Sequence, residues 1–371
     1  MNTMVNRGLR ALGAGALVLA VLAVPGVASA HEKWFVDEPG RYPTDWSFVA
    51  RPISLGLIAA VVFATLVWRY VAVRFLPTPE LAPLRFLGRL VPYVPRLLGI
   101  HLGVSLLAAA VSGHFLTHDL SLEHVAGGDL LLLVEGALGI WFVAGFQVRV
   151  AAIGLALVGP FALLVTGPVG LLSAMDLLGV AVFLAFVPPT DAPFGRVEFA
   201  AATLRRGLLA LRLGAGGALI TLAFAEKFAN PALARETLRL YPQLDVFAVV
   251  GIHLPADTFI AVAGATELLF GLLVISGALP QVAVLVAGIP FNATLWFFGT
   301  TELVGHLPVY GAMLLLLVYG SDPVLRPAVS ALWPPPMSSA VARGLLQDRT
   351  RRREDQKWRR EEPRPCRPRP W

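Results

Sequence analysis

The sequence has little cysteine and little charge. Only one of its 371 residues is a cysteine, Cys366, so an intrachain disulfide framework, a cysteine zinc site and a CxxC redox pair are all excluded. Charged residues make up 15% of the chain, against about 25% in an ordinary soluble domain. Hydrophobic residues make up 56%, and the mean hydropathy is +0.71. The composition therefore indicates an integral membrane protein.

The formal net charge of +6 lies entirely in the C-terminal tail. From Arg343 to Trp371 there are 11 basic and 5 acidic residues, so the remainder of the chain is neutral and gives no indication of nucleic-acid binding. Because residues 334–371 have too few apolar side chains for a core, we expect a disordered basic tail. Two roles stay open for it: contact with anionic lipid of the inner leaflet, or solubility alone.

The N-terminus reads as a targeting segment. A short basic start, the apolar run 11–24 and the small residues up to Ala30 predict a signal peptide over residues 1–30. Cleavage after Ala30 leaves His31 as the first residue. If cleavage does not occur, the same segment becomes a membrane anchor, and His31 still lies on the outer side.

Nine further apolar segments have about the 17–25 residues that a helix needs to cross a bilayer. With His31 outside, the cytoplasmic loops hold eleven basic and four acidic residues, whereas the outer segments hold six basic and twelve acidic ones. This asymmetry predicts a multi-pass protein of a bacterial plasma membrane with a cytoplasmic C-terminus. The segments are 52–73, 97–113, 129–146, 149–166, 170–187, 208–226, 258–276, 281–299 and 305–320.

An internal repeat divides the apolar region. When Glu135 is aligned with Glu267, both halves read E-x3-G-x5-G. The predicted fold is therefore all-α, with two parallel four-helix bundles, 96–190 and 208–322. Residues 31–95 precede them as an extracytoplasmic segment, one membrane helix and an inner loop.

The second half carries four short motifs that resemble the DoxX-like four-helix membrane proteins over about 110 residues. The first half is a more divergent copy, with Asp176 but no histidine near the start of its last helix. The resemblance implies a bacterial inner-membrane protein, in some members linked to sulfur-compound oxidation that feeds the quinone pool, or to oxidative-stress complexes. It fixes no reaction. The motifs are Arg212-Leu213-Gly214, Glu226-Lys227-Phe228, Glu267-x3-Gly271 and Gly305-His306-x-Pro308.

Three carboxyl groups lie within the predicted membrane helices: Glu135, Asp176 and Glu267. Ionised carboxylates are costly in hydrocarbon, so such residues face the bundle interior and are candidate proton-carrying or quinol-binding groups. The alternative is a protonated or hydrogen-bonded carboxyl that holds helices together. Both interpretations stay open.

Histidines cluster on the predicted outer side and are candidate metal ligands. His114, His118 and His124 lie in one short loop, where imidazoles suit Zn, Cu, Fe or Ni. His31, as a processed N-terminus, combines an α-amine with an imidazole, a set of nitrogen ligands that favours copper. The alternatives are a solvated loop and an accident of cleavage.

Four further residues form a polar outer rim of the second half: Glu226, Lys227, Glu302 and His306. A carboxylate one helical turn from a histidine, as in Glu302 and His306, can fix the tautomer of the ring. The segment 227–257 is the longest outer loop, and we expect it to carry a short amphipathic helix on the surface.

Two classes of function remain. The first is a binding or redox-supporting protein with copper or quinone at an outer polar site, for example a subunit of a quinone-linked oxidoreductase. The second is a non-catalytic scaffold or assembly subunit, for which a periplasmic or redox partner supplies the activity. A transporter is a weaker third interpretation, because the repeats are parallel and no broken helix is evident.

Overall fold

The computed structural model describes residues 36, 41–77, 79–117, 120–122, 125–161, 168, 170–191, 197, 201–298 and 300–332. These residues form helices and turns, and one isolated bridge between His114 and Ser121 is the β-type pairing among them. The predicted all-α class is therefore confirmed. The predicted signal peptide 1–30 and the tail 334–371 lie outside the described residues.

The helices follow the apolar segments of the sequence closely. Short 3-10, π-helical and α-helical pieces lie between the longer ones. In chain order they are α2 (Pro52–Arg74), η3 (Ala82–Leu90), α3 (Val94–Val111), α4 (Gly128–Ala144), α5 (Val148–Val158), α7 (Met175–Phe186), α8 (Ala201–Leu222), η4 (Ala223–Phe228), α9 (Pro231–Leu240), η5 (Pro242–Leu244), α10 (Val246–Val249), α11 (Ala256–Ser276), α12 (Pro280–Phe298), α13 (Thr300–Gly305), α14 (Leu307–Ser321) and α15 (Arg326–Ser330).

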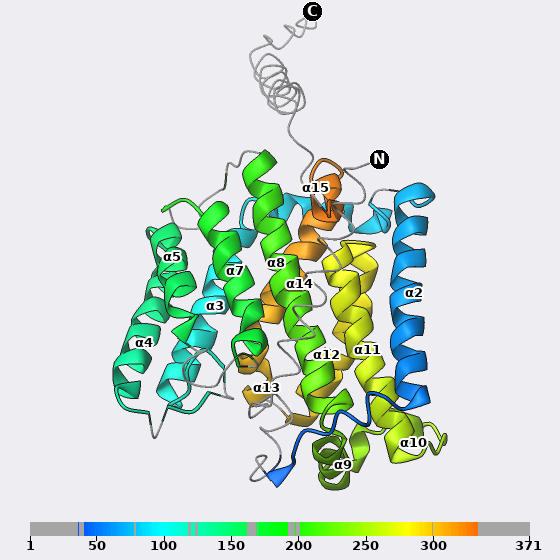
Figure 1. Ribbon diagram of the computed structural model, residues 1–371. Coiled ribbons are helices and arrows are strands. Elements are labelled where there is room, and N and C mark those ends of the chain that lie inside the picture. The colour runs from blue at the N-terminus through cyan, green and yellow to red at the C-terminus, as the bar shows by residue number, and fades with distance from the viewer. Residues whose placement is uncertain are drawn as a thin grey trace, which may run out of the picture.

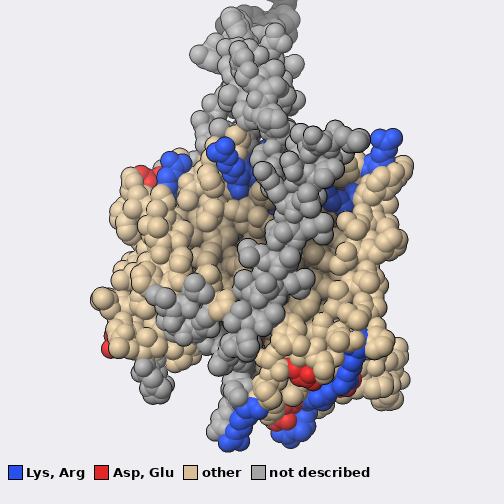
Figure 2. Space-filling model, viewed as in Figure 1, with Lys and Arg blue, Asp and Glu red and all other residues tan. Residues whose placement is uncertain are grey.

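Four helices are long and apolar enough to cross a membrane: α2, α3, α8 with its extension η4, and α11. Their lipid-facing character is clearest in α2, where Phe63 and Leu66 are 69% and 64% exposed. Figure 2 shows charged side chains at the two ends of the molecule and a broad band of other residues between them. This is the surface expected of a multi-pass membrane protein.

The two ends differ in their secondary structure. Helices α9 and α10 lie across one end, called here the α9 end, and α15 lies at the opposite end, called the α15 end (Figure 1). At the α9 end, Phe48 is fully buried in the cluster that contains Phe228 and Ile260. The segment before α2 therefore packs on η4 and α11. The short amphipathic helix expected within 227–257 is α9.

Eight of the helices after η3 are taken here, in chain order, as two groups of four: α3, α4, α5 and α7, then α8, α11, α12 and α14. In the first group α3 packs on α4 and α5 packs on α7; in the second group α8 packs on α11 and α12 packs on α14. The groups are joined where α7 meets α8 and where α14 meets α3. Helix α2 stands outside both groups and packs on α11 (Figure 1).

Glycines allow the first two helices of each group to cross closely. A Cβ atom on Gly103 would lie 2.7 Å from the carbonyl oxygen of Gly139, and a Cβ on Gly216 would lie 2.6 Å from that of Gly271. Because real Cβ atoms essentially never approach backbone oxygens so closely, a larger residue would force the helices apart. Gly139 and Gly271 are the glycines that the sequence repeat aligns.

The junction between the groups is equally tight. A Cβ on Gly214 of α8 would collide with the carbonyl oxygen of Met175 and would lie 2.6 Å from the Cα of Gly179, both in α7. The two helices therefore touch backbone to backbone, which brings the polar start of α7 against α8.

Arginine side chains hold α15 against the neighbouring helices through hydrogen bonds. Arg212 of α8 is fully buried and donates to the carbonyl oxygens of Val329 and, at 2.9 Å, Ala331. Arg69 of α2 donates to the carbonyl of Ser330 at 3.2 Å. Cationic side chains are favoured at a helix C-terminus, where backbone carbonyls lack helical partners.

A buried ion pair completes this arrangement. Arg326 of α15 contacts Glu80 at 3.0 Å, and each of these side chains is only 4% exposed. Glu80 also accepts the N–H of Gln281 at 2.8 Å, at the start of α12. The α15 end is thus held by contacts between residues that are far apart in the sequence.

We predict that Gly214→Ala lowers the free energy of unfolding by about 1–3 kcal/mol or more, because its Cβ has no room against α7. Thermal unfolding of the purified protein in detergent measures this. Gly56→Ala is the control: no atom lies within 4 Å of its Cβ position on α2, so this variant should match or exceed the wild type. Equal losses in both variants would contradict the tight junction.

We predict that a chain ending at Asp322 unfolds far more easily than one ending at Leu332. The shorter chain lacks α15 and leaves Arg212 and Glu80 without the partners described above, at a cost of about 3 kcal/mol or more. The chain ending at Leu332 keeps these contacts and should keep the wild-type unfolding midpoint. A common midpoint for both truncations would show that α15 is dispensable.

Candidate functional site

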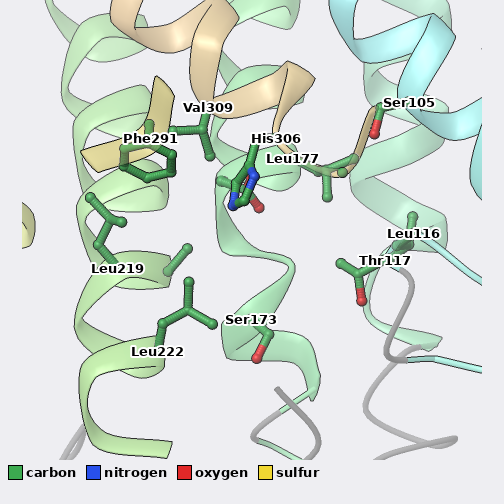
Figure 3. A pocket seen from close by; sticks show the side chains of 13 residues that line it. Ser105, Leu116, Thr117, Ser173, Leu177, Leu219, Leu222, Phe291, His306 and Val309 are labelled. Atoms are coloured by element: carbon green, nitrogen blue, oxygen red, sulfur yellow. The ribbon is translucent and has the colours of Figure 1, made fainter. Parts of the chain in front are cut away.

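A cavity with both apolar and polar lining residues lies between the two helix groups. Residues of α3, α7, α8, α12 and the start of α14 line it, together with Leu116 and Thr117 from the turn after α3. Its volume is about 50 Å³. One water needs about 10–15 Å³ of such space, so the cavity has room for a few waters. Figure 3 shows the residues that surround it.

Asp176 and His306 both line this cavity. Asp176 lies in the first turn of α7 and is 7% exposed; His306 is the residue immediately before α14 and is 6% exposed. A carboxylate is favoured in a first turn because backbone N–H groups there are unpaired. The His306 ring meets the ring of Phe291 edge-on, with 5.1 Å between centroids, which fixes its orientation.

Hydroxyl groups extend the polar lining. Ser105, Thr117 and Ser173 face the same cavity (Figure 3). Among the described residues, the buried Oγ1 of Thr117 has no hydrogen-bond partner. A buried hydroxyl normally finds a partner, so a water in the cavity is the natural partner for it.

Glu135 lies just behind the cavity wall. It is fully buried in α4, and its Oε1 accepts the backbone N–H of Leu116 at 2.8 Å. Leu116 has a φ of 63°, a strained value for a non-glycine residue, and this hydrogen bond helps to hold it. Glu135 therefore stabilises the turn that forms part of the cavity wall and is not itself a lining residue.

Glu226, Lys227 and Glu267 form a separate ion cluster. The Lys227 ammonium lies 2.8 Å from Glu226 and 3.0 Å from Glu267. Lys227 and Glu226 are carried by the π-helical turn η4, which places successive residues so that both can turn inward. The side chain of Glu226 is 2% exposed and that of Glu267 is 32% exposed. Two residues of the predicted outer rim, Glu226 and Lys227, thus form a partly buried ion cluster with Glu267.

The candidate metal ligands are only partly described. His114 contacts the Ser112 hydroxyl at 3.1 Å through Nδ1. His31, His118, His124 and the side chain of Glu302 lie outside the described residues. Within the described part of the chain, no group of three His, Cys, Asp or Glu side chains is close enough to hold a metal ion. The structure therefore does not test the prediction that copper binds at His31.

Asp176 and His306 line the same cavity although the sequence analysis assigned them to different sets. Asp176 was grouped with the intramembrane carboxyls, and His306 with the outer rim. The sequence does contain a feature that could have indicated this: both residues lie at the start of the last helix of their half. Sequence reasoning missed the hydroxyls of Ser105 and Thr117, since isolated Ser and Thr residues are common in membrane helices and carry no pattern.

Comparisons with protein-family models, with curated proteins and with solved structures found no match to this chain. The DoxX-like resemblance therefore rests on the motifs alone. The chemistry of the site has to be argued from its own residues.

We predict that Lys227→Met lowers the free energy of unfolding by about 3–5 kcal/mol, because it leaves two carboxylates close together without their cation. Adding Glu226→Gln should recover part of the loss. Thermal unfolding in detergent measures both. Arg239→Ala, which removes an exposed ion pair with Glu236 on α9, should leave the midpoint nearly unchanged. An unchanged midpoint in Lys227→Met would show that the cluster is solvated.

Proposed function

We propose that this chain is a DoxX-like membrane protein with nine spans, arranged as two parallel four-helix repeats after α2. The packing supports this proposal. In each group the first helix packs on the second and the third on the fourth, and the last helix of each group packs on the first helix of the other. Two repeats related by an axis along the membrane normal would have this pattern.

Residue pairs at a fixed spacing also support the repeat. Glu135 and Glu267 are 132 residues apart. The same spacing relates residues around the start of the last helix in each half, and all of these line the cavity: Ser173 with Gly305, and Leu177 with Val309. The cavity therefore lies on the proposed axis and belongs to both halves.

In this proposal the α9 end faces the outside of a bacterial plasma membrane. The loops at the α15 end carry most of the basic residues of the body, which favours a cytoplasmic location for that end. Asp176 and His306, at the starts of α7 and α14, then lie in the outer half of the membrane.

We further propose that Asp176 and His306 take up and release protons in the cavity, for a reaction on the outer side of the membrane. One observation carries this: two ionisable side chains, one from each half, line a single buried cavity with room for water. An imidazole changes its charge between about pH 5 and 8 and serves as an acid or a base. A carboxyl beside the same water can exchange protons with it.

The binding of copper and the binding of a quinone both remain predictions. The copper hypothesis depends on His31, which is outside the described residues. A quinol would be a chemically suitable proton donor, but a cavity of about 50 Å³ is much smaller than the roughly 300–1,000 Å³ of ordinary ligand pockets. A quinone would therefore require the cavity to widen, whereas protons and water require no change.

The scaffold function has its own support. Lys227 is paired with both Glu226 and Glu267, and Glu135 accepts a hydrogen bond from Leu116. These are the contacts expected of polar groups that hold helices together. The repeat glutamates therefore favour a structural role, and the case for chemistry rests on Asp176 and His306.

Infrared spectroscopy of the purified full-length protein tests the proton-exchange proposal. We expect a carboxylic-acid band that titrates with pH and disappears in Asp176→Asn. Because the two groups share one low-dielectric cavity, His306→Gln should move the midpoint of that band by about one pH unit.

Glu236→Gln, on α9, where the native side chain is paired with Arg239, is the control and should leave the Asp176 band unchanged. Each variant is first checked for a wild-type unfolding midpoint. An Asp176 band that does not titrate, or one whose midpoint is unchanged in His306→Gln, would favour the scaffold function.

A further inference from the structure

Seven consecutive apolar residues connect α9 to α11 at the α9 end. They run from Val246 to Ile252, comprise α10 and the turn after it, and are called here the 246–252 turn. Four of its aliphatic side chains are more than half exposed: Val246 at 55%, Val249 at 72%, Val250 at 70% and Ile252 at 52%. Aliphatic side chains that cluster on a surface in this way mark a contact site.

The backbone N–H groups from Phe247 to Ile252 all donate to partners within or beside this turn. The Asp245 carboxylate caps α10 by accepting the N–H groups of Phe247 and Ala248, both at 3.1 Å. The next four N–H groups, of residues 249 to 252, all donate to carbonyl oxygens between residues 245 and 248. A segment that carries no charge and has most of its backbone donors paired loses fewer hydrogen bonds when it leaves water.

The turn is continuous with the lipid-facing surface. The ring of Phe247 meets the ring of Phe259 in α11 edge-on, at 6.1 Å between centroids. Phe259 in turn packs in the cluster that includes Leu57 and Ile58 of α2. Figure 1 shows α10 beside the foot of α2 and α11. At that same end of α2, Leu55 is 51% exposed.

We propose that the 246–252 turn inserts into the bilayer surface at the α9 end, among the lipid headgroups and the first carbons of the acyl chains. The exposed Val249 and Val250 enter the lipid, while Asp245 and His253 mark the two sides at which the chain returns to water. Lipid is the occupant that the structure favours, because Phe247 and Phe259 join the turn to the apolar cluster that includes Leu57 and Ile58 of α2. The apolar faces of helical segments that lie on a membrane enter the boundary between headgroups and acyl chains at this depth.

Insertion gives the turn a mechanical role. It joins α9, which covers η4, to α11, which carries Glu267. An anchor between them fixes the level at which the outer part of the second helix group meets the membrane. This role does not depend on proton exchange in the cavity.

Spin labelling in vesicles tests the proposal, and the sequence makes it practical. Cys366 is the single cysteine, so Cys366→Ser gives a background into which Val249→Cys and Val250→Cys place one nitroxide each. The full-length protein is reconstituted into vesicles of phosphatidylethanolamine and phosphatidylglycerol. Relaxation by oxygen, which concentrates in lipid, is compared with relaxation by a water-soluble nickel chelate.

Two control positions calibrate the measurement. Phe63→Cys, on the exposed face of α2, should report lipid, and Arg239→Cys, whose native side chain is 67% exposed on α9, should report water. We expect oxygen-to-nickel ratios at 249 and 250 that are severalfold above that at 239 and below that at 63, because Phe63 lies at the middle of α2 and the turn is proposed to lie near the membrane surface. If Phe63→Cys itself reports water, membrane embedding fails as a whole.

Two results would overturn the proposal while the controls behave as expected. Nickel access at 249 and 250 equal to that at 239 would place the turn in water. Immobile labels that neither reagent reaches would show that protein, either a partner or a second copy of this chain, covers the turn instead of lipid.

Discussion

The backbone contact between α7 and α8 is the constraint on which the rest of the structure depends. At Gly179 and Gly214 the two helices approach so closely that neither position tolerates a Cβ atom. Asp176 lies one turn before Gly179, so this contact also sets the position of its carboxyl. Because α14 meets α3 on the other side, the two groups enclose a cavity where α7 and α14 begin. Close packing of small residues thus helps to position an interior cavity that an acid and an imidazole, Asp176 and His306, both line.

Charge is handled differently at the two ends of the molecule. At the α15 end, Arg212 and Arg69 are balanced chiefly by backbone carbonyls at the ends of α15 and α11. At the α9 end, Lys227 is balanced by two carboxylates. At both ends, each charged group has several partners. These partners lower the free-energy cost of removing the charge from water. Asp176 and His306 line a cavity with room for water, and the proposed proton exchange rests on this difference.

Much of the fold could be predicted from hydropathy, because an apolar segment of sufficient length has few alternatives to a helix. The segment expected at 52–73 is Pro52–Arg74, and that at 258–276 is Ala256–Ser276. Contacts between residues far apart in the sequence could not be predicted. A hydropathy pattern indicates how deep a residue lies in the membrane, but it does not indicate which other residues it contacts. The pair of Arg326 with Glu80 joins residues 246 positions apart. The positive φ of Leu116 has no signal in the sequence, because leucine rarely adopts it.

Helix length explains why the polar site lies where it does. With 12 and 15 residues, α7 and α14 extend only about 18 Å and 22 Å, less than the roughly 30 Å of hydrocarbon in a bilayer. If their C-terminal ends reach the membrane surface at the α15 end, their N-terminal ends lie within the hydrocarbon. The chain before each of these helices is also helical, over residues 170–173 and in α13, so a turn at Ala174 and another at His306 interrupt two longer helical paths. Asp176 and His306 lie at these interruptions, which explains why both line the cavity.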